Sequence, residues 1–160
     1  MIEERKKLFQ GGSYAQFIKA NGQVLPYILL MIDNYASFRE KTDNKYESNL
    51  LALSREGMNY GLYLVISAGG FGAGELQNRI ADNFHSVVCL EMGDKFKYSE
   101  VLRTPHLDVL PENNIKGRGL ANIGGRTLEF QTALAIQAAD DYARAEKLRV
   151  CFSEMNRVWN

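Results

Sequence analysis

An acidic residue, Asp33, follows directly after the apolar run Tyr27-Ile28-Leu29-Leu30-Met31-Ile32. An unbroken apolar run of this kind, opened by Pro26, predicts a strand that is covered on both faces in a parallel sheet. In such sheets ligands bind beyond the carboxyl ends of the strands, where an Asp can hold Mg²⁺ through its water shell beside a nucleotide phosphate. Asp33 is therefore a candidate metal and cofactor residue, and its alternative role is to cap the strand end or the following turn.

Other reactive side chains form no familiar catalytic or metal-binding pattern. Cys89 lies in an apolar run and is expected to be a small buried hydrophobe; the two cysteines show neither CxxC nor Cys/His zinc-site spacing. His85 and His106 have no Ser or Cys nucleophile at a recognisable spacing, which leaves no catalytic triad. Arg79, on the helix expected after the Gly-rich stretch 69–74, is either an arginine finger for a neighbouring subunit or a solvated charge.

These residues are expected on alternating helices and strands. Apolar runs and three- or four-residue spacings predict helices at 2–10, 13–19, 46–57, 76–84 and 97–102, strands at 62–66 and 87–91, and a loop at 39–45. Strands that alternate with helices indicate an α/β fold with a mainly parallel sheet and right-handed crossovers. Later in the chain, Gly124-Gly125 between two short strands at 117–123 and 127–134 predicts a β-hairpin.

The C-terminal residues predict one long amphipathic helix over 137–160. One face of it carries residues that recur every three or four positions: Ala138, Tyr142, Ala145, Arg149, Phe152, Met155 and Trp159.

Composition limits the class of protein. The chain has 160 residues, 46% of them hydrophobic, which suits one domain with a real core. Lys+Arg and Asp+Glu both number 19, and this zero net charge argues against a protein that grips nucleic acid mainly through phosphate contacts. Two cysteines and no apolar stretch near the roughly 20 residues of a membrane span favour a cytoplasmic setting.

Three segments occur in an informative order along the chain. Residues 26–38 contain Asp33, then Asn34, an aromatic residue, Ala and Ser; residues 54–68 contain a helix, Gly61 and a strand; Gly117-Arg118-Gly119-Leu120 forms a Gly-x-Gly turn. In this order they resemble the Walker B segment, sensor strand and late turn of FtsK/SpoIIIE-type P-loop ATPases. With segments 128–134 and 154–159 included, the chain is most similar to the ATPase modules of EssC/EccC type VII secretion proteins.

The departures from that family concern the chemistry. No G-x-x-x-x-G-K-[S/T] phosphate loop occurs, and only 32 residues precede Asp33, so we expect the C-terminal part of a module over 1–135 and a helix or linker to a following module over 136–160. Asn34 stands at the position of the catalytic Glu, and an amide cannot accept the proton of the attacking water. The family's Ala-Thr-Gln-Arg-Pro is replaced by 67–71, Ser-Ala-Gly-Gly-Phe, without the Gln or the Arg.

The resemblance implies a partial RecA-like domain in which strand 62–66 lies parallel beside strand 28–32. It also implies that Asp33 holds Mg²⁺ through water and that Ser67 and Arg79 contribute to cofactor binding. ATP and Mg²⁺ are expected in the intact parent but not on this chain alone. The expected partners are other ATPase modules and small secreted helical effectors, with nucleic acid disfavoured and the membrane reached only through the parent. We interpret the chain as a degenerate ATPase module of a type VII secretion motor, with a nucleotide-binding, regulatory or substrate-receiving role.

Two alternatives remain open at this point. A DNA-translocating ATPase fragment of the same superfamily fits the motifs, but the zero net charge and the missing catalytic groups count against it. The segment Asp33-Asn34-Tyr35-Ala36-Ser37 also partly matches the D-x-S-x-S metal-adhesion motif of von Willebrand A domains, although Tyr35 replaces the first Ser. That second alternative predicts a Mg²⁺-dependent binding domain with a metal at Asp33 and Ser37.

Overall fold

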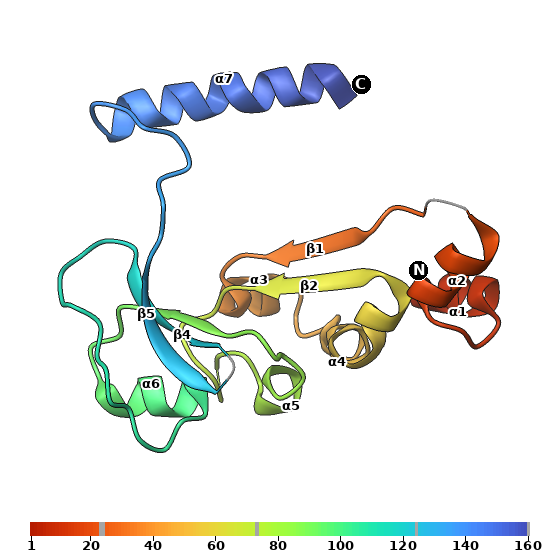
Figure 1. Ribbon diagram of the computed structural model, residues 1–160, viewed down its shortest axis with the longest axis horizontal. Coiled ribbons are helices and arrows are strands. Elements are labelled where there is room, and N and C mark those ends of the chain that lie inside the picture. The colour runs from red at the N-terminus through yellow and green to blue at the C-terminus, as the bar shows by residue number, and fades with distance from the viewer. Residues whose placement is uncertain (23–24, 73, 124, 160) are drawn as a thin grey trace.

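The computed structural model describes residues 1–22, 25–72, 74–123 and 125–159, drawn as a ribbon in Figure 1. In chain order its elements are α1 (Ile2–Phe9), α2 (Tyr14–Asn21), β1 (Ile28–Ile32), α3 (Tyr35–Lys41), α4 (Glu47–Glu56), the 3-10 helix η1 (Gly57–Tyr60), β2 (Leu62–Ile66), α5 (Asn78–Ala81), β3 (Val88–Leu90), α6 (Lys95–Leu102), β4 (Arg118–Ile123), β5 (Arg126–Gln131) and α7 (Asp141–Trp159). The α/β fold class expected from the sequence is confirmed.

The two long apolar runs form a parallel pair of strands. β1 and β2 pair from Ile28↔Leu62 to Ile32↔Ile66, which confirms the expected parallel neighbours. The ladder continues beyond the strands at both ends, because the Ile28 N–H donates to the Gly61 carbonyl and the Ser67 N–H donates to the Ile32 carbonyl. The carboxyl ends of both strands therefore meet at one edge, directly before the loops that carry Asp33 and Ser67.

Only one face of this parallel pair is covered. The covered face and the helices α3, α4 and α5 enclose a core of Ile32, Tyr35, Leu50, Leu76, Ile80 and Ala81. On the opposite face Leu29 and Met31 are 57% and 67% exposed, so the expectation that β1 is covered on both faces is wrong for this structure. An unbroken apolar run shows that both faces of a strand are apolar, but it does not show whether other elements cover both faces.

The third strand lies in a different sheet from the one expected. β3 pairs antiparallel with β4, and β4 pairs antiparallel with β5, in a sheet separate from β1 and β2. Helix α6 covers it through a second core that includes Tyr98, Leu102, Leu120 and Cys89. Burial raises the pKa of the Cys89 thiol to about 11, in keeping with its expected role as a small hydrophobe. A side chain at Gly119 would meet the Cys89 carbonyl oxygen at 2.2 Å, so only Gly permits this pairing.

The β-hairpin expected at 117–134 is confirmed as β4 and β5, although Gly124 of its turn lies outside the described residues. Three helical expectations need correction. The loop expected at 39–45 is partly helix α3, which begins after Asn34 and ends at Lys41. The helix expected at 76–84 is only the one-turn helix α5; Ile80 is buried within it, and the buried Leu76 lies before it. The long C-terminal helix expected over 137–160 is present as α7, which begins at Asp141, four residues later, and has no buried residue.

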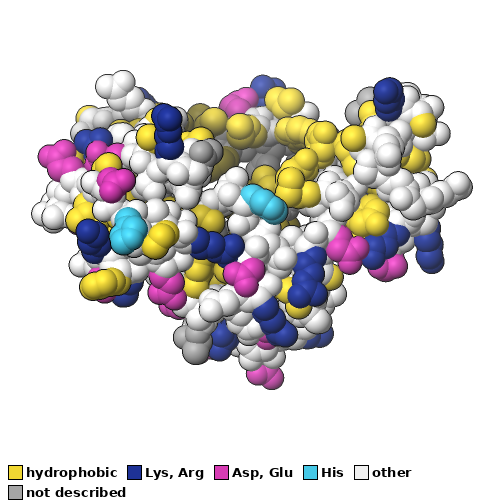
Figure 2. Space-filling view, turned by 60° about the horizontal axis from the view of Figure 1, so that its bottom comes forward, with side chains coloured by type: hydrophobic (Ala, Val, Ile, Leu, Met, Phe, Trp, Pro, Cys, Tyr) yellow, Lys and Arg dark blue, Asp and Glu magenta, His cyan; other side chains and the backbone are white. Residues whose placement is uncertain are grey.

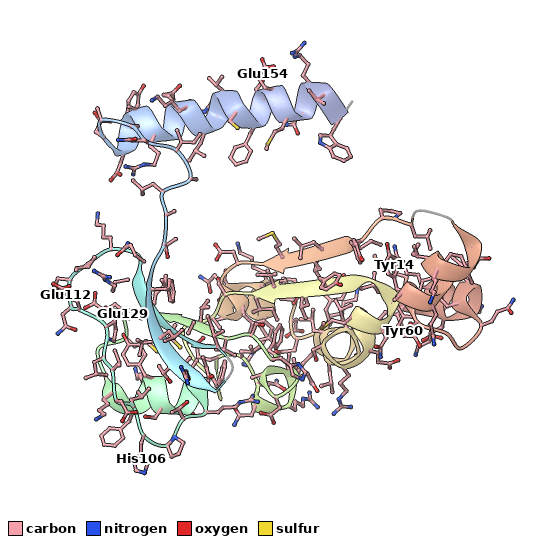
Figure 3. The ribbon with its side chains drawn as sticks, in the orientation of Figure 1. Tyr14, Tyr60, His106, Glu112, Glu129 and Glu154 are labelled. Carbon is pink, nitrogen blue, oxygen red and sulfur yellow. The ribbon has the colours of Figure 1, made fainter. Side chains whose placement is uncertain are left out.

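A buried arginine joins the N-terminal helices to the sheet. Arg5 of α1 is 7% exposed and donates to the carbonyls of Tyr60 and Pro26, at 2.7 Å each. Its guanidinium also lies 5.9 Å from the centre of the Tyr14 ring, and Figure 3 shows Tyr14 and Tyr60 at this end of the molecule. Gly61 sits beneath this cluster with φ of 70°, where a Cβ would lie 2.6 Å from the Tyr14 ring. Arg5 therefore fixes the amino ends of both parallel strands.

Replacing Arg5 with Ala is expected to lower the free energy of unfolding by about 2–3 kcal/mol, because two carbonyl oxygens lose a charged donor in a shielded setting. Urea unfolding followed by circular dichroism measures this change. Lys7→Ala, at an exposed position of the same helix, is the matched control and is expected to stay within about 0.5 kcal/mol of the unmodified chain. Equal unfolding midpoints for the two variants would contradict the role given to Arg5.

Candidate functional site

The acid at the end of β1 is bonded to the hydroxyl at the end of β2. Ser67 Oγ donates to Asp33 Oδ1 at 2.5 Å and accepts the Asn34 N–H at 2.9 Å. The Ser67 carbonyl also accepts the Tyr35 N–H at 2.9 Å, so the hydroxyl and the carbonyl of one residue hold the turn after β1 through three hydrogen bonds. Both side chains are exposed at the edge where the strands end. The structure thus brings together two of the site residues expected from the sequence.

Asn34, at the expected position of the catalytic Glu, has a structural task. Its backbone is left-handed, with φ of 54°, a conformation that Asn tolerates better than most residues. Its Oδ1 accepts the Ser37 N–H at 3.2 Å and so caps the first turn of α3. The amide oxygen is therefore directed at the helix backbone, where it stabilises the start of α3.

Arg79, the third expected site residue, bonds to residues other than Asp33 and Ser67. Its guanidinium forms an ion pair with Glu47 of α4 and its Nε donates to Gln77 at 2.8 Å. The hydrogen bond that Arg79 donates to Glu47 lowers the pKa of the Glu47 carboxyl below its ordinary value. Among the described residues, no hydrogen bond links Arg79 to Asp33 or to Ser67. Sequence reasoning missed Glu47, because no local pattern relates residues that are 32 positions apart.

Two backbone amides of the Gly-rich stretch 69–74 already have partners within the chain. The Gly69 N–H donates to the Glu75 carboxylate at 3.1 Å, and the Gly72 N–H donates to the Leu76 carbonyl at 2.9 Å. A phosphate would have to displace the carboxylate of Glu75, which carries the same sign of charge. The intervening Ala73 lies outside the described residues.

The residues at this edge fit one part of a Mg²⁺–nucleotide site. One exposed carboxylate beside a hydroxyl suits a magnesium ion that keeps most of its water ligands, since Mg²⁺ dehydrates reluctantly. A direct metal cage is not formed, because no group of three or more His, Cys, Asp or Glu side chains converges within the described ranges. The contact of Ser37 with Asn34 is made by its backbone N–H and does not engage its hydroxyl, so a metal-adhesion site at Asp33 and Ser37 stays a prediction.

Comparisons with known proteins give one consistent result. No family model matches the chain. It is 24% identical to the type VII secretion system protein EssC of Staphylococcus aureus over 99% of this chain, and 25% identical to the ESX secretion system protein YukB of Bacillus subtilis over 92%. These alignments cover only 11% and 10% of the two relatives, so the chain spans about a tenth of their length.

A solved structure shares the fold. EssC (ATPases 2 and 3) from Geobacillus thermodenitrificans matches with a TM-score of 0.75 over 98% of this chain and 29% of that one, at 18% identity. The chain therefore has the fold of an EssC ATPase domain, as expected from its motifs, and its resemblance to type VII secretion ATPases is confirmed over nearly its whole length.

Restoring an acid at Asn34 tests whether this position is now structural. Asn34→Glu is expected to lower the free energy of unfolding by about 1–2 kcal/mol, because the cap of α3 is lost and a residue ill-suited to positive φ is introduced. Asn34→Asp keeps both the cap and the tolerance of this backbone, and is expected to remain within about 0.5 kcal/mol. Thermal or urea unfolding of the three chains compares them. A Glu variant as stable as the Asp variant would show that the position carries no structural constraint.

Proposed function

We propose that this chain is a degenerate ATPase module of a type VII secretion motor, which takes part in nucleotide binding or relays its effect but does not hydrolyse ATP. Its similarity to EssC and YukB supports the motor family. The carrying observation is the hydrogen bond between Ser67 and Asp33 at the carboxyl ends of adjacent parallel strands, where a motor ATPase holds its magnesium.

The proposed loss of hydrolysis follows from the same edge of the sheet. A hydrolase needs a base that takes a proton from water, and the side chain of Asn34 is an amide that caps α3. It also needs a phosphate-binding loop, which the sequence lacks, and the Gly-rich stretch 69–74 already bonds to Glu75. The remaining pair, Asp33 and Ser67, suits a position beside the magnesium ion of a nucleotide that other parts of the protein bind.

The proposed partners are other ATPase modules of the same protein or its oligomer, and small secreted helical proteins that the motor exports. The solved EssC structure contains two ATPases, which supports a setting of several modules. Within the described residues no helix is long and apolar enough to cross a bilayer. From the similarity to the secretion proteins EssC and YukB, we propose that the module acts in the cytoplasm and that other parts of a longer protein make its attachment to the membrane.

A role in gripping nucleic acid is not supported by the charge distribution. The chain has no net charge. On the face shown in Figure 2, Lys and Arg side chains are interspersed with Asp and Glu. A surface that binds DNA would instead carry a cluster of basic residues.

The purified chain is expected to show no ATP hydrolysis with Mg²⁺ present, and no saturable binding of a fluorescent ATP analogue. A coupled phosphate-release assay at micromolar protein and a fluorescence titration measure the two quantities. Asn34→Glu is expected to remain inactive as well, because a restored base has no held phosphate to act upon. Turnover by the unmodified chain that disappears in Asp33→Ala would overturn the proposal, since it would show a competent active site.

A further inference from the structure

The C-terminal helix α7 has an apolar stripe that is not covered by the rest of the chain. Leu148, Phe152, Met155 and Trp159 are spaced by four, three and four residues and so lie along one side of the helix. Trp159 is 89% exposed and Phe152 is 59% exposed. The other side carries the ion pairs Glu146–Arg149 and Glu154–Arg157, a pattern suited to solvent. We call the first set of four residues the α7 stripe.

The parallel sheet presents an apolar face of matching size. Leu29 and Met31 alternate along β1 in step with Tyr27, which directly precedes it, and the ladder places Tyr63 beside Leu29 and Val65 beside Met31. All five of these side chains are exposed. A contiguous set of this kind on a sheet normally packs against another layer. We call these five residues the open sheet face.

The two apolar surfaces lie on the same side of the molecule. In Figure 1, α7 lies on one side of the β1–β2 pair while α3 and α4 lie on the other. Since the core with α3, α4 and α5 uses the covered face, the open sheet face is the one toward α7. Figure 3 shows Glu154 on the side of α7 that points away from β1. The α7 stripe lies on the other side of the helix from Glu154, because Phe152 and Glu154 are about 200° apart around it.

The lengths of the surfaces and the connection between them also agree. The α7 stripe spans eleven helical steps, about 16 Å, and the open sheet face extends about 13 Å along β1. Residues 132–140 connect β5 to α7. Among the described residues, no backbone hydrogen bond involves 133–136, so this segment can act as the hinge. A short tether makes docking within one chain far more frequent than docking between chains at low concentration.

We propose that α7 turns about residues 133–136 and packs its stripe against the open sheet face of the same chain. The closed form buries the five sheet residues and the four helix residues against each other, and it leaves the ion-paired side of α7 in solvent. The inference goes beyond the proposed function, because it depends on neither nucleotide nor any second protein. It makes α7 a lid on the sheet that carries Asp33 and Ser67 at its end.

The single tryptophan, Trp159, reports on closure in the full chain. We expect its fluorescence to be shifted to shorter wavelength, and its quenching by acrylamide to be several-fold weaker than that of a free tryptophan derivative. Met31→Asp on the open sheet face and Phe152→Asp on the α7 stripe should each raise the quenching several-fold. Both positions are exposed, and circular dichroism verifies that the variants remain folded.

Two matched controls carry the same change at positions outside the proposed contact. Val150 is an exposed apolar residue on the solvent side of α7, and Leu90 is an exposed apolar residue of the other sheet. Val150→Asp and Leu90→Asp should leave the quenching of Trp159 unchanged. Equal quenching in the unmodified chain, Met31→Asp and Phe152→Asp would overturn the proposal.

Dilution separates closure within one chain from docking on a second copy. Protection of Trp159 that persists on dilution, in a species that sedimentation shows to be a monomer, supports the proposal. Protection that is lost on dilution together with a sedimenting dimer would overturn it, because the occupant of the open sheet face would then be the helix of another copy.

Discussion

The register of the β1–β2 ladder is the constraint on which the rest of the site depends. Pairing from Ile28↔Leu62 to Ile32↔Ile66 brings the two strand ends level, so that Asp33 and Ser67 follow at the same edge. Since side chains alternate along a strand, a shift by one residue would send every core side chain to the other face. Arg5 holds the amino ends of both strands through two carbonyls, and the buried Ile32 anchors the opposite end.

A common theme runs through the candidate site: each group that could act on a ligand already has a partner in the chain. Ser67 bonds to Asp33, Asn34 caps α3, Arg79 pairs with Glu47, and the Gly69 amide bonds to Glu75. Such internal pairing stabilises a turn or a helix end. The chain has the fold of an EssC ATPase domain, and these polar groups of the candidate site stabilise its turns and helix ends.

Sequence patterns predicted what is local. Apolar runs located β1 and β2, Gly-rich spacing located the hairpin, and the family resemblance supplied the parallel pairing. They did not predict the open face of β1, because covering depends on other elements, nor the short α5. Helix α3 was missed although Asn34, a good cap, precedes Tyr35 and Phe38 at helical spacing. The pairings of Arg79 with Glu47 and Asp33 with Ser67 join residues more than 30 positions apart, which no local pattern encodes.

The long crossover between β1 and β2 has a consequence for the order of folding. The paired residues Ile28 and Leu62 are 34 positions apart (62 − 28), and α3, α4 and η1 lie between them. Closing such a loop costs chain entropy before the hydrogen bonds of the ladder stabilise it, whereas the β4–β5 hairpin joins residues that are close in the sequence. The bond between Ser67 and Asp33 can therefore form only once the crossover is complete. The hydrogen bond between these two side chains thus forms late in folding and holds the completed crossover in place.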